Sequence, residues 1–146
     1  MEKVAEVQLT YKTKVKPSER AKVHSSISAV DILRPFYGDD IEYIEKMYVI
    51  YLNRANKVLG VNLLSSGGTS QTVCDPKMIF QGAILANASA IILSHNHPSG
   101  ALKPSEADIN LTKKIKQGCE LFDIALLDHV IVTPEHYFSF ADEGII

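Results

Sequence analysis

The sequence predicts an α/β fold, in which strands and helices alternate along the chain and pack in layers. Three patterns in the sequence carry this prediction. A strand pattern at residues 58–64 is followed by a helix signal at Asp75-Pro76, and the apolar run at residues 90–93 then reads as a short buried strand. This strand, helix, strand order is typical of a βαβ crossover, whose ligands bind beyond the carboxyl ends of the strands.

Length and composition indicate one domain, residues 1–146, with a net charge of −2. This charge gives no general attraction to nucleic acid or to an anionic membrane. No apolar run approaches the ~20 residues of a membrane span, and the first residues lack the apolar core of a signal peptide. Cys74 and Cys119 are too few for a disulfide framework. We therefore expect a cytoplasmic protein, monomeric or homodimeric.

The first third of the chain predicts one edge strand and one short helix. The alternation Val7, Leu9, Tyr11 favours an edge strand within residues 4–13. A cluster of basic residues follows, interpreted as a solvated strand end and loop, with a nucleic-acid or partner patch as the alternative: Lys12, Lys14, Lys16, Arg20 and Lys22. Ser25 or Ser26 is suited to cap a helix whose extent Pro35 limits.

The middle of the chain predicts a hairpin and then a helix. Residues 45–53 are apolar on both faces and indicate a central strand, which turns at residues 54–57 and returns over residues 58–64. The loop Gly67-Gly68-Thr69-Ser70 lacks the spacing of a phosphate-binding loop. Asp75-Pro76 combines a helix N-cap with proline at the first helical position. An apolar stripe then follows at helical spacing: Ile79, Phe80, Ala83, Ile84 and Asn87.

The last third of the chain predicts a helix followed by two further strands. The helix runs from Ser105 to about Cys119, with its lysines facing solvent. Residues 124–133 favour a strand that Asp128-His129 interrupts, and residues 137–140 a final short strand.

The stretch from Ser94 to Asp108 carries the chemistry. His95 and His97 stand two residues apart at the end of a strand, so both side chains point to the same face. Ser105 then opens a helix with Asp108 in its first turn, which is also the pattern of a helix-capping box. The two interpretations are compatible, because Ser105 can cap the helix while Asp108 turns toward a metal. Two nitrogens and one carboxylate leave a fourth position for water, as in catalytic zinc sites.

These residues resemble a known family. The segment His-Asn-His-Pro-Ser-Gly, then Pro104-Ser105 and Asp108, is similar to the His-x-His-x7-Ser-x2-Asp motif of the RadC branch of the JAB/MPN metalloprotease superfamily. The resemblance implies a cytidine-deaminase-like mixed sheet flanked by helices in three layers. It extends over most of the chain, from the strand after Glu45 to the closing Ser139-Phe140-Ala141-Asp142.

The resemblance also implies roles for individual residues. His95, His97 and Asp108 would bind Zn²⁺, and Ser105 would hydrogen-bond the bound water or the developing oxyanion. An upstream glutamate would act as general base, for which Glu45 is the matching position and Glu42 the alternative. The implied reaction is hydrolysis of a peptide or isopeptide bond.

Alternatives to a hydrolase stay open at this point. The RadC name implies DNA repair, so a DNA-repair or mobile-element-associated nucleic-acid-binding module, with or without nuclease activity, is the second hypothesis. The helix-hairpin-helix module of full-length RadC proteins is not expected in this chain. An inactive scaffold held by its metal is the third. We interpret Cys74 as a small buried thiol, and the alternative is a fourth metal ligand. We interpret His129 as a histidine satisfied by backbone or carboxylate, and the alternative is contact with a metal ligand.

Overall fold

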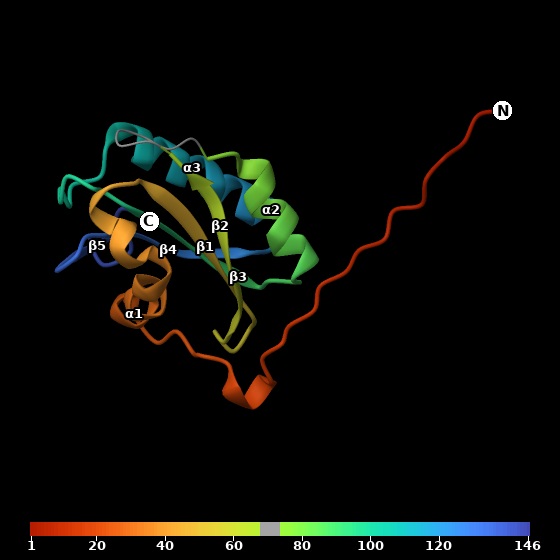
Figure 1. The fold of residues 1–146 in the computed structure, drawn as a ribbon, viewed down its shortest axis with the longest axis horizontal. Helices are drawn as coiled ribbons and strands as arrows, with labels where there is room; N and C mark the ends of the chain where they lie inside the picture. Colours follow the sequence, from red (N-terminus) through yellow and green to blue (C-terminus); the bar gives the residue numbers. More distant parts are fainter. Residues whose placement is uncertain (68–73) are drawn as a thin grey trace.

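The computed structural model of the chain describes residues 1–67 and 74–146, and its centre is a five-stranded mixed β-sheet. Helix α1 (Ser26–Tyr37) covers one face of the sheet, while α2 (Pro76–Leu85) and α3 (Glu106–Leu121) cover the other (Figure 1). The predicted α/β class and three-layer arrangement are confirmed. In spatial order the strands are β2 (Val58–Ser66), β1 (Lys46–Leu52), β3 (Ala90–Asn96), β4 (Ala125–Val132) and β5 (Tyr137–Ser139).

Strands β1 and β2 form the predicted hairpin. β1 is buried from its second residue to its last, because it lies between β2 and β3 and pairs with both in antiparallel fashion. The side chain of Asn53 fixes the turn by accepting hydrogen bonds from the N–H groups of Ala55 and Lys57, each 3.0 Å long. Of the loop predicted at residues 67–70, only Gly67 belongs to the described part of the chain.

Two crossovers build the rest of the sheet. β2 and β3 are both antiparallel to β1, so the connection through α2 joins two parallel strands with β1 between them. Helix α3 joins β3 to its parallel neighbour β4. The predicted interruption of β4 at Asp128-His129 is wrong, because β4 continues through both residues. The irregularity lies at Leu127, where the pairing steps from Ile91–Leu126 to Ile92–Asp128.

Local chemistry explains where the helices begin. Asp75 caps α2 by accepting a 2.9 Å hydrogen bond from the Lys77 N–H, with proline next in the chain, as predicted. The prediction that Pro35 limits α1 is wrong, since the proline lies inside the helix and α1 continues to Tyr37. Tyr37 is only 1 % exposed, and its burial against the sheet offsets the backbone hydrogen bond that proline cannot donate.

The two faces of the sheet carry separate apolar cores. The core between the sheet and helices α2 and α3 includes Val49, Ile79, Leu93, Ile115 and Cys119. The core between the sheet and α1 includes Leu33, Tyr48, Ile50, Ile92 and Val130. Alternate residues of β1 and β3 serve opposite cores, as the period of two in a strand requires. Both strands are therefore fixed on both faces, and their ends are rigid positions for a site.

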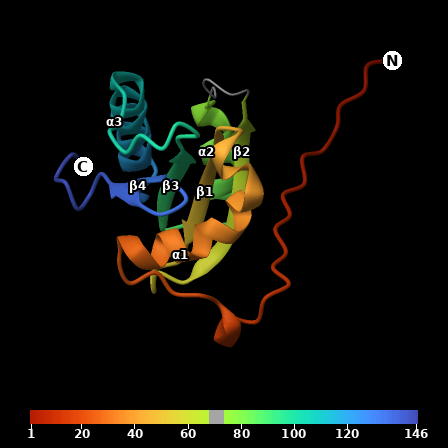
Figure 2. The ribbon, with the colours of Figure 1, turned by 60° about the vertical axis from the view of Figure 1, so that its left-hand side comes forward.

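The first residues lie outside this sandwich. The predicted edge strand at residues 4–13 is wrong: the segment has no regular structure, and Figure 2 shows it leading away from the sheet. Val7 is 83 % exposed and Leu9 is 76 % exposed, so the alternating pattern has an apolar face without a covering layer in the described residues. The 3₁₀ helix η1 (Pro17–Glu19) follows. No helix in the described ranges combines the length and apolar character that a bilayer crossing requires.

Candidate metal centre

The end of β3 and the start of α3 bring the motif together. His95 lies in the last part of β3, paired with Met47 of β1, and His97 follows directly after the strand. The chain then turns, with the Gly100 N–H donating to the His97 carbonyl at 2.9 Å. Gly100 has a φ of +83°, which glycine adopts without strain.

The predicted capping box at the start of α3 is confirmed. Ser105 Oγ accepts a 3.0 Å hydrogen bond from the Asp108 N–H, and Asp108 Oδ2 accepts a 2.8 Å hydrogen bond from the Ser105 N–H. This reciprocal pair fixes the Asp108 carboxylate at the head of the helix. The same oxygen of Asp108 faces the two histidines, so the cap and the approach to the histidines coexist in one side chain.

Three atoms form a compact triangle. Nε2 of His95 lies 3.0 Å from Nε2 of His97, and these nitrogens lie 3.3 Å and 3.4 Å from Oδ2 of Asp108. A tetrahedral zinc ion with bonds of ~2.0–2.2 Å separates its ligand atoms by about 3.3–3.6 Å. The two sides that end at Asp108 fall in this range and the side between the imidazoles is shorter, at 3.0 Å, so a small separation of the two rings would fit the residues to a bound metal.

The charges in the triangle favour a cation at its centre. Burial raises the pKa of the Asp108 carboxyl, but hydrogen bonds from His95 and His97, which form when these rings carry a proton on Nε2, outweigh burial and hold the pKa well below its usual range. The hydrogen bond with Asp108 raises the pKa of His97, against an opposing effect of burial. Three acceptor atoms this close repel one another unless a proton or a metal ion lies among them.

A chain of hydrogen bonds orients the His95 ring. The Thr112 hydroxyl donates its one proton to the Asp108 carbonyl at 2.7 Å. Oγ1 of Thr112 must therefore accept from Nδ1 of His129, which lies 2.6 Å away. Burial holds the pKa of His129 well below its ordinary value, so the ring is neutral and its Nε2 carries no proton. That Nε2 accepts from Nδ1 of His95 at 2.7 Å. The lone pair on Nε2 of His95 consequently faces Asp108 and His97.

His97 is oriented in the same way by the backbone. Its Nδ1 donates to the Ala101 carbonyl at 2.8 Å, which leaves Nε2 as the acceptor that faces the triangle. Ligating imidazoles in metalloproteins almost always donate their second nitrogen to such a partner. Both imidazoles are therefore set in the tautomer that metal binding requires.

Sequence reasoning favoured the wrong interpretation of His129. We interpreted it as a core histidine satisfied by backbone or carboxylate, whereas its ring contacts His95 and Thr112 and stacks on Phe140 at a centroid distance of 4.6 Å. No spacing in the sequence links His129 to His95, since the two are neighbours only because β3 and β4 pair.

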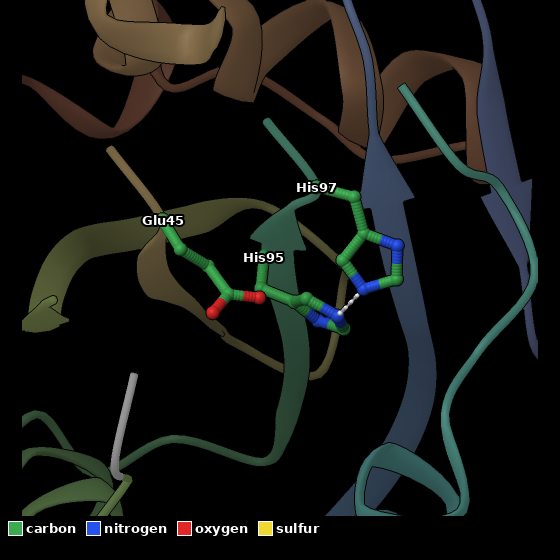
Figure 3. Close-up of side chains that lie close together, drawn as sticks. All are labelled: Glu45, His95 and His97. Atoms are coloured by element: carbon green, nitrogen blue, oxygen red, sulfur yellow. Dashed lines mark hydrogen bonds between the residues drawn. The ribbon is translucent and has the colours of Figure 1, made fainter. Parts of the chain in front are cut away.

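Glu45 lies beside the two histidines. One of its carboxylate oxygens and a nitrogen from each imidazole all lie within 4.8 Å of one another. Figure 3 shows the Glu45 carboxylate turned toward His95 from the segment just before β1. Glu45 is buried, at 7 % exposure, whereas Glu42 is exposed at the end of the 3₁₀ helix η2 (Gly38–Glu42). The geometry places Glu45, and not Glu42, in the cluster that could hold a metal ion among the described residues.

Cys74 and Ser105 occupy different surroundings. Cys74 is half-buried against the core beneath α2 and α3, and burial raises the pKa of its thiol to about 11. This is the environment of a packing residue. Ser105 is exposed, and because its Oγ accepts from the Asp108 N–H, the hydroxyl proton is available to a further acceptor.

Fold and site together define a class, an α/β domain in which two histidines and a glutamate, gathered where the interior strands β1 and β3 meet, could hold a metal ion. Residues 23–145 match the RadC-like JAB domain family, and the chain belongs to that family. The JAB superfamily is hydrolase-like. The match confirms the family that the motif resembles.

The names of similar proteins do not state an activity. A UPF0758 protein of Flavobacterium johnsoniae is 44 % identical over 124 residues, which cover 85 % of this chain and 53 % of that protein. A UPF0758 protein of Porphyromonas gingivalis is 41 % identical over 128 residues, covering 87 % of this chain and 56 % of that protein. The chain thus spans about half the length of the curated relatives it matches.

Proposed function

We propose that this domain is a zinc-dependent metallopeptidase that hydrolyses peptide or isopeptide bonds. The observation that carries the proposal is the triangle of His95, His97 and Asp108, with sides of 3.0–3.4 Å and the Glu45 carboxylate beside it. A structural zinc site needs four protein ligands and no base, whereas a catalytic site takes three and leaves one position open.

Each side chain has a role that its position supports. His95, His97 and Asp108 would hold Zn²⁺, which when bound lowers the pKa of water from ~15.7 toward ~7 and polarises a carbonyl. Glu45 would accept a proton from the attacking water and return it to the leaving amine. Ser105 would donate its free hydroxyl proton to the developing oxyanion, a contribution of ~3–4 kcal/mol for one well-placed donor.

The experiment combines metal analysis with an unbiased peptide screen. The purified chain is loaded with Zn²⁺, its metal content is determined, and a proteome-derived peptide mixture and a set of isopeptide-linked peptides are incubated with it and analysed by mass spectrometry. We expect one zinc per chain and specific cleavage. His97→Ala should lose the metal, and Glu45→Gln should keep the metal and lose cleavage by about 10²-fold or more. Glu42→Gln is the matched control and should cleave normally. Cleavage by Glu45→Gln at the wild-type rate would remove Glu45 from the mechanism.

A nucleic-acid-binding module is the second candidate. Its support is the exposed basic run of Lys12, Lys14 and Lys16 in the extended N-terminal segment. Such binding should weaken with salt by ~0.9 log units per log unit of salt for each phosphate contacted. The peptidase proposal expects no mobility shift on single- or double-stranded DNA or RNA at low salt. A shift that disappears when these lysines are changed to glutamine would favour the second candidate.

A further inference from the structure

The side chain between the two histidines makes three hydrogen bonds of its own. Asn96 Oδ1 accepts from the Lys46 N–H at 2.7 Å, while its Nδ2 donates to the carbonyls of Ile41 and Ile44 at 2.8 and 2.9 Å. The residue is fully buried. One donor and two acceptors among its partners permit only one orientation of the amide, so the side chain is locked.

These partners surround Glu45. Ile44 precedes it and Lys46 follows it, so the amide of Asn96 forms hydrogen bonds with the backbone on both sides of the glutamate. The carbonyl of Glu45 itself accepts from the Gly67 N–H at 2.9 Å, beside the end of β2. Glu45 stands just outside β1, whose regular pairing with β3 ends at Met47 and His95. The Asn96 side chain therefore continues, by one residue, a ladder that the backbone no longer provides.

Asn96 also occupies a fixed place with respect to the metal ligands. It is the last residue of β3, between His95 and His97, and its backbone pairs with Val132 of β4. A movement of the Glu45 segment relative to the histidines would break at least one of its three side-chain hydrogen bonds. Serine or threonine at this position has a single oxygen and a shorter reach, and cannot replace all three bonds.

We propose that Asn96 is a positioning residue, which sets the distance between the Glu45 carboxylate and the metal bound by its neighbouring histidines. This inference rests on the proposed role of Glu45 as proton acceptor. The same carboxylate on an untethered segment would meet the metal centre with a spread of distances, and displacement by about 1 Å can cost ~10²-fold in rate.

The test compares two asparagines that flank the same strand. Asn96→Ser removes the amide that bonds the backbone around Glu45. Asn53→Ser removes two side-chain hydrogen bonds at the opposite end of β1, in the hairpin turn. Asn96→Asp is the second variant: it keeps the acceptor for Lys46 and turns the donor toward Ile41 and Ile44 into an acceptor. Amide hydrogen exchange of Lys46 is measured in the metal-free protein. Co²⁺ affinity, and the pH midpoint of the visible spectrum of the Co²⁺-loaded protein, are then measured for wild type, each variant, Glu45→Gln and the double variant.

We expect the Lys46 amide of Asn96→Ser to exchange about tenfold faster or more, because its hydrogen bond is lost. Co²⁺ affinity should stay within about tenfold, less than the loss of a ligand would produce. The spectral midpoint should move in the same direction as in Glu45→Gln, and the double variant should match Glu45→Gln alone, since Asn96 acts through that side chain. Asn53→Ser should match wild type in all three measurements. If Asn96→Ser does not fold, Asn96→Asp is judged by the same results.

Two results would overturn the inference while leaving the proposed function intact. One is a wild-type midpoint in both Asn96 variants when Glu45→Gln has shifted it. The other is a double variant whose midpoint shift is the sum of the two single shifts. A wild-type chain that takes up no Co²⁺ or Zn²⁺ would instead remove the metal centre, and the role of Asn96 with it.

Discussion

Nδ1 of His95 lies 2.7 Å from Nε2 of His129, and this contact ties a candidate metal ligand to the interior of the domain. The link continues through the Thr112 hydroxyl to the backbone carbonyl of Asp108, the third candidate ligand. A chain of three hydrogen bonds therefore links His95 to Asp108 behind the triangle. In each bond the donor and the acceptor are fixed.

The first prediction concerns this hydrogen-bond chain. Thr112→Val and His129→Leu each remove two of its three hydrogen bonds, so His95 loses its fixed tautomer and zinc affinity should fall by about 10–100-fold. Thr112→Ser keeps the hydroxyl and should bind zinc nearly as wild type does. Affinities are measured by competition with a chromogenic chelator, with the exposed His136→Gln as control. Equal affinities for Thr112→Val and Thr112→Ser would show that the hydroxyl does not orient the ligand.

The second prediction separates the two roles of Ser105. Ser105→Ala removes the acceptor for the Asp108 N–H and should lower the free energy of unfolding by about 1 kcal/mol. Asp75→Ala, which removes the side-chain cap of α2, should cost about the same. Urea denaturation measures both. Peptide hydrolysis should slow in Ser105→Ala and not in Asp75→Ala. An equal loss of hydrolysis rate in both variants would show that Ser105 acts only as a helix cap.

The third prediction concerns pH and Asp128. Burial raises the pKa of this carboxyl, against the opposing hydrogen bond from Ser139. A raised pKa in the fold favours the protonated form, so the stabilising contribution is present below the unfolded pKa near ~4 and is lost as the pH rises through the folded pKa. Asp128→Asn does not titrate.

The free energy of unfolding of wild type relative to Asp128→Asn should therefore fall as the pH rises from about 4 toward neutrality. Urea denaturation of both proteins in EDTA, which removes any pH dependence from metal binding, gives this difference. A difference that is constant, or that grows toward neutral pH, would contradict the assignment of burial as the dominant cause.

The fourth prediction concerns metal and stability. Zinc that binds the folded chain alone should raise the free energy of unfolding by ~2.7 kcal/mol at a free concentration 100 times its Kd. Thermal unfolding with buffered zinc and with EDTA measures this shift. Asp108→Asn should show little of it, because the carboxylate contributes one of the three ligands. An equal shift in Asp108→Asn would place the zinc elsewhere.

Much of the fold could be predicted because the signals are local. Asp75-Pro76 specifies a helix start through one side chain and one fixed φ, and the apolar faces of residues 45–53 can only belong to a strand covered on both sides. The cap of α3 and the spacing of His95 and His97 are likewise contained within fifteen residues. Pro35 misled the prediction because tertiary burial of Tyr37 overrides a local signal.

The rest depends on strand pairing. His129 meets His95 only because β3 and β4 lie parallel and adjacent, and Asn96 meets the Glu45 segment only because β1 lies on the other side of β3. Neither neighbour relationship has a sequence spacing that could reveal it. The strand predicted at residues 4–13 was wrong because a period of two indicates an amphipathic strand but does not show whether a sheet edge is present for it to pair with.

The most direct test of the metal centre is a crystal structure of the chain grown with Zn²⁺, with anomalous data at the zinc edge. We predict one ion bound by Nε2 of His95, Nε2 of His97 and the Asp108 carboxylate, with Glu45 close by but not coordinating. An ion closed by four protein side chains, or no anomalous peak among these residues at saturating zinc, would contradict it.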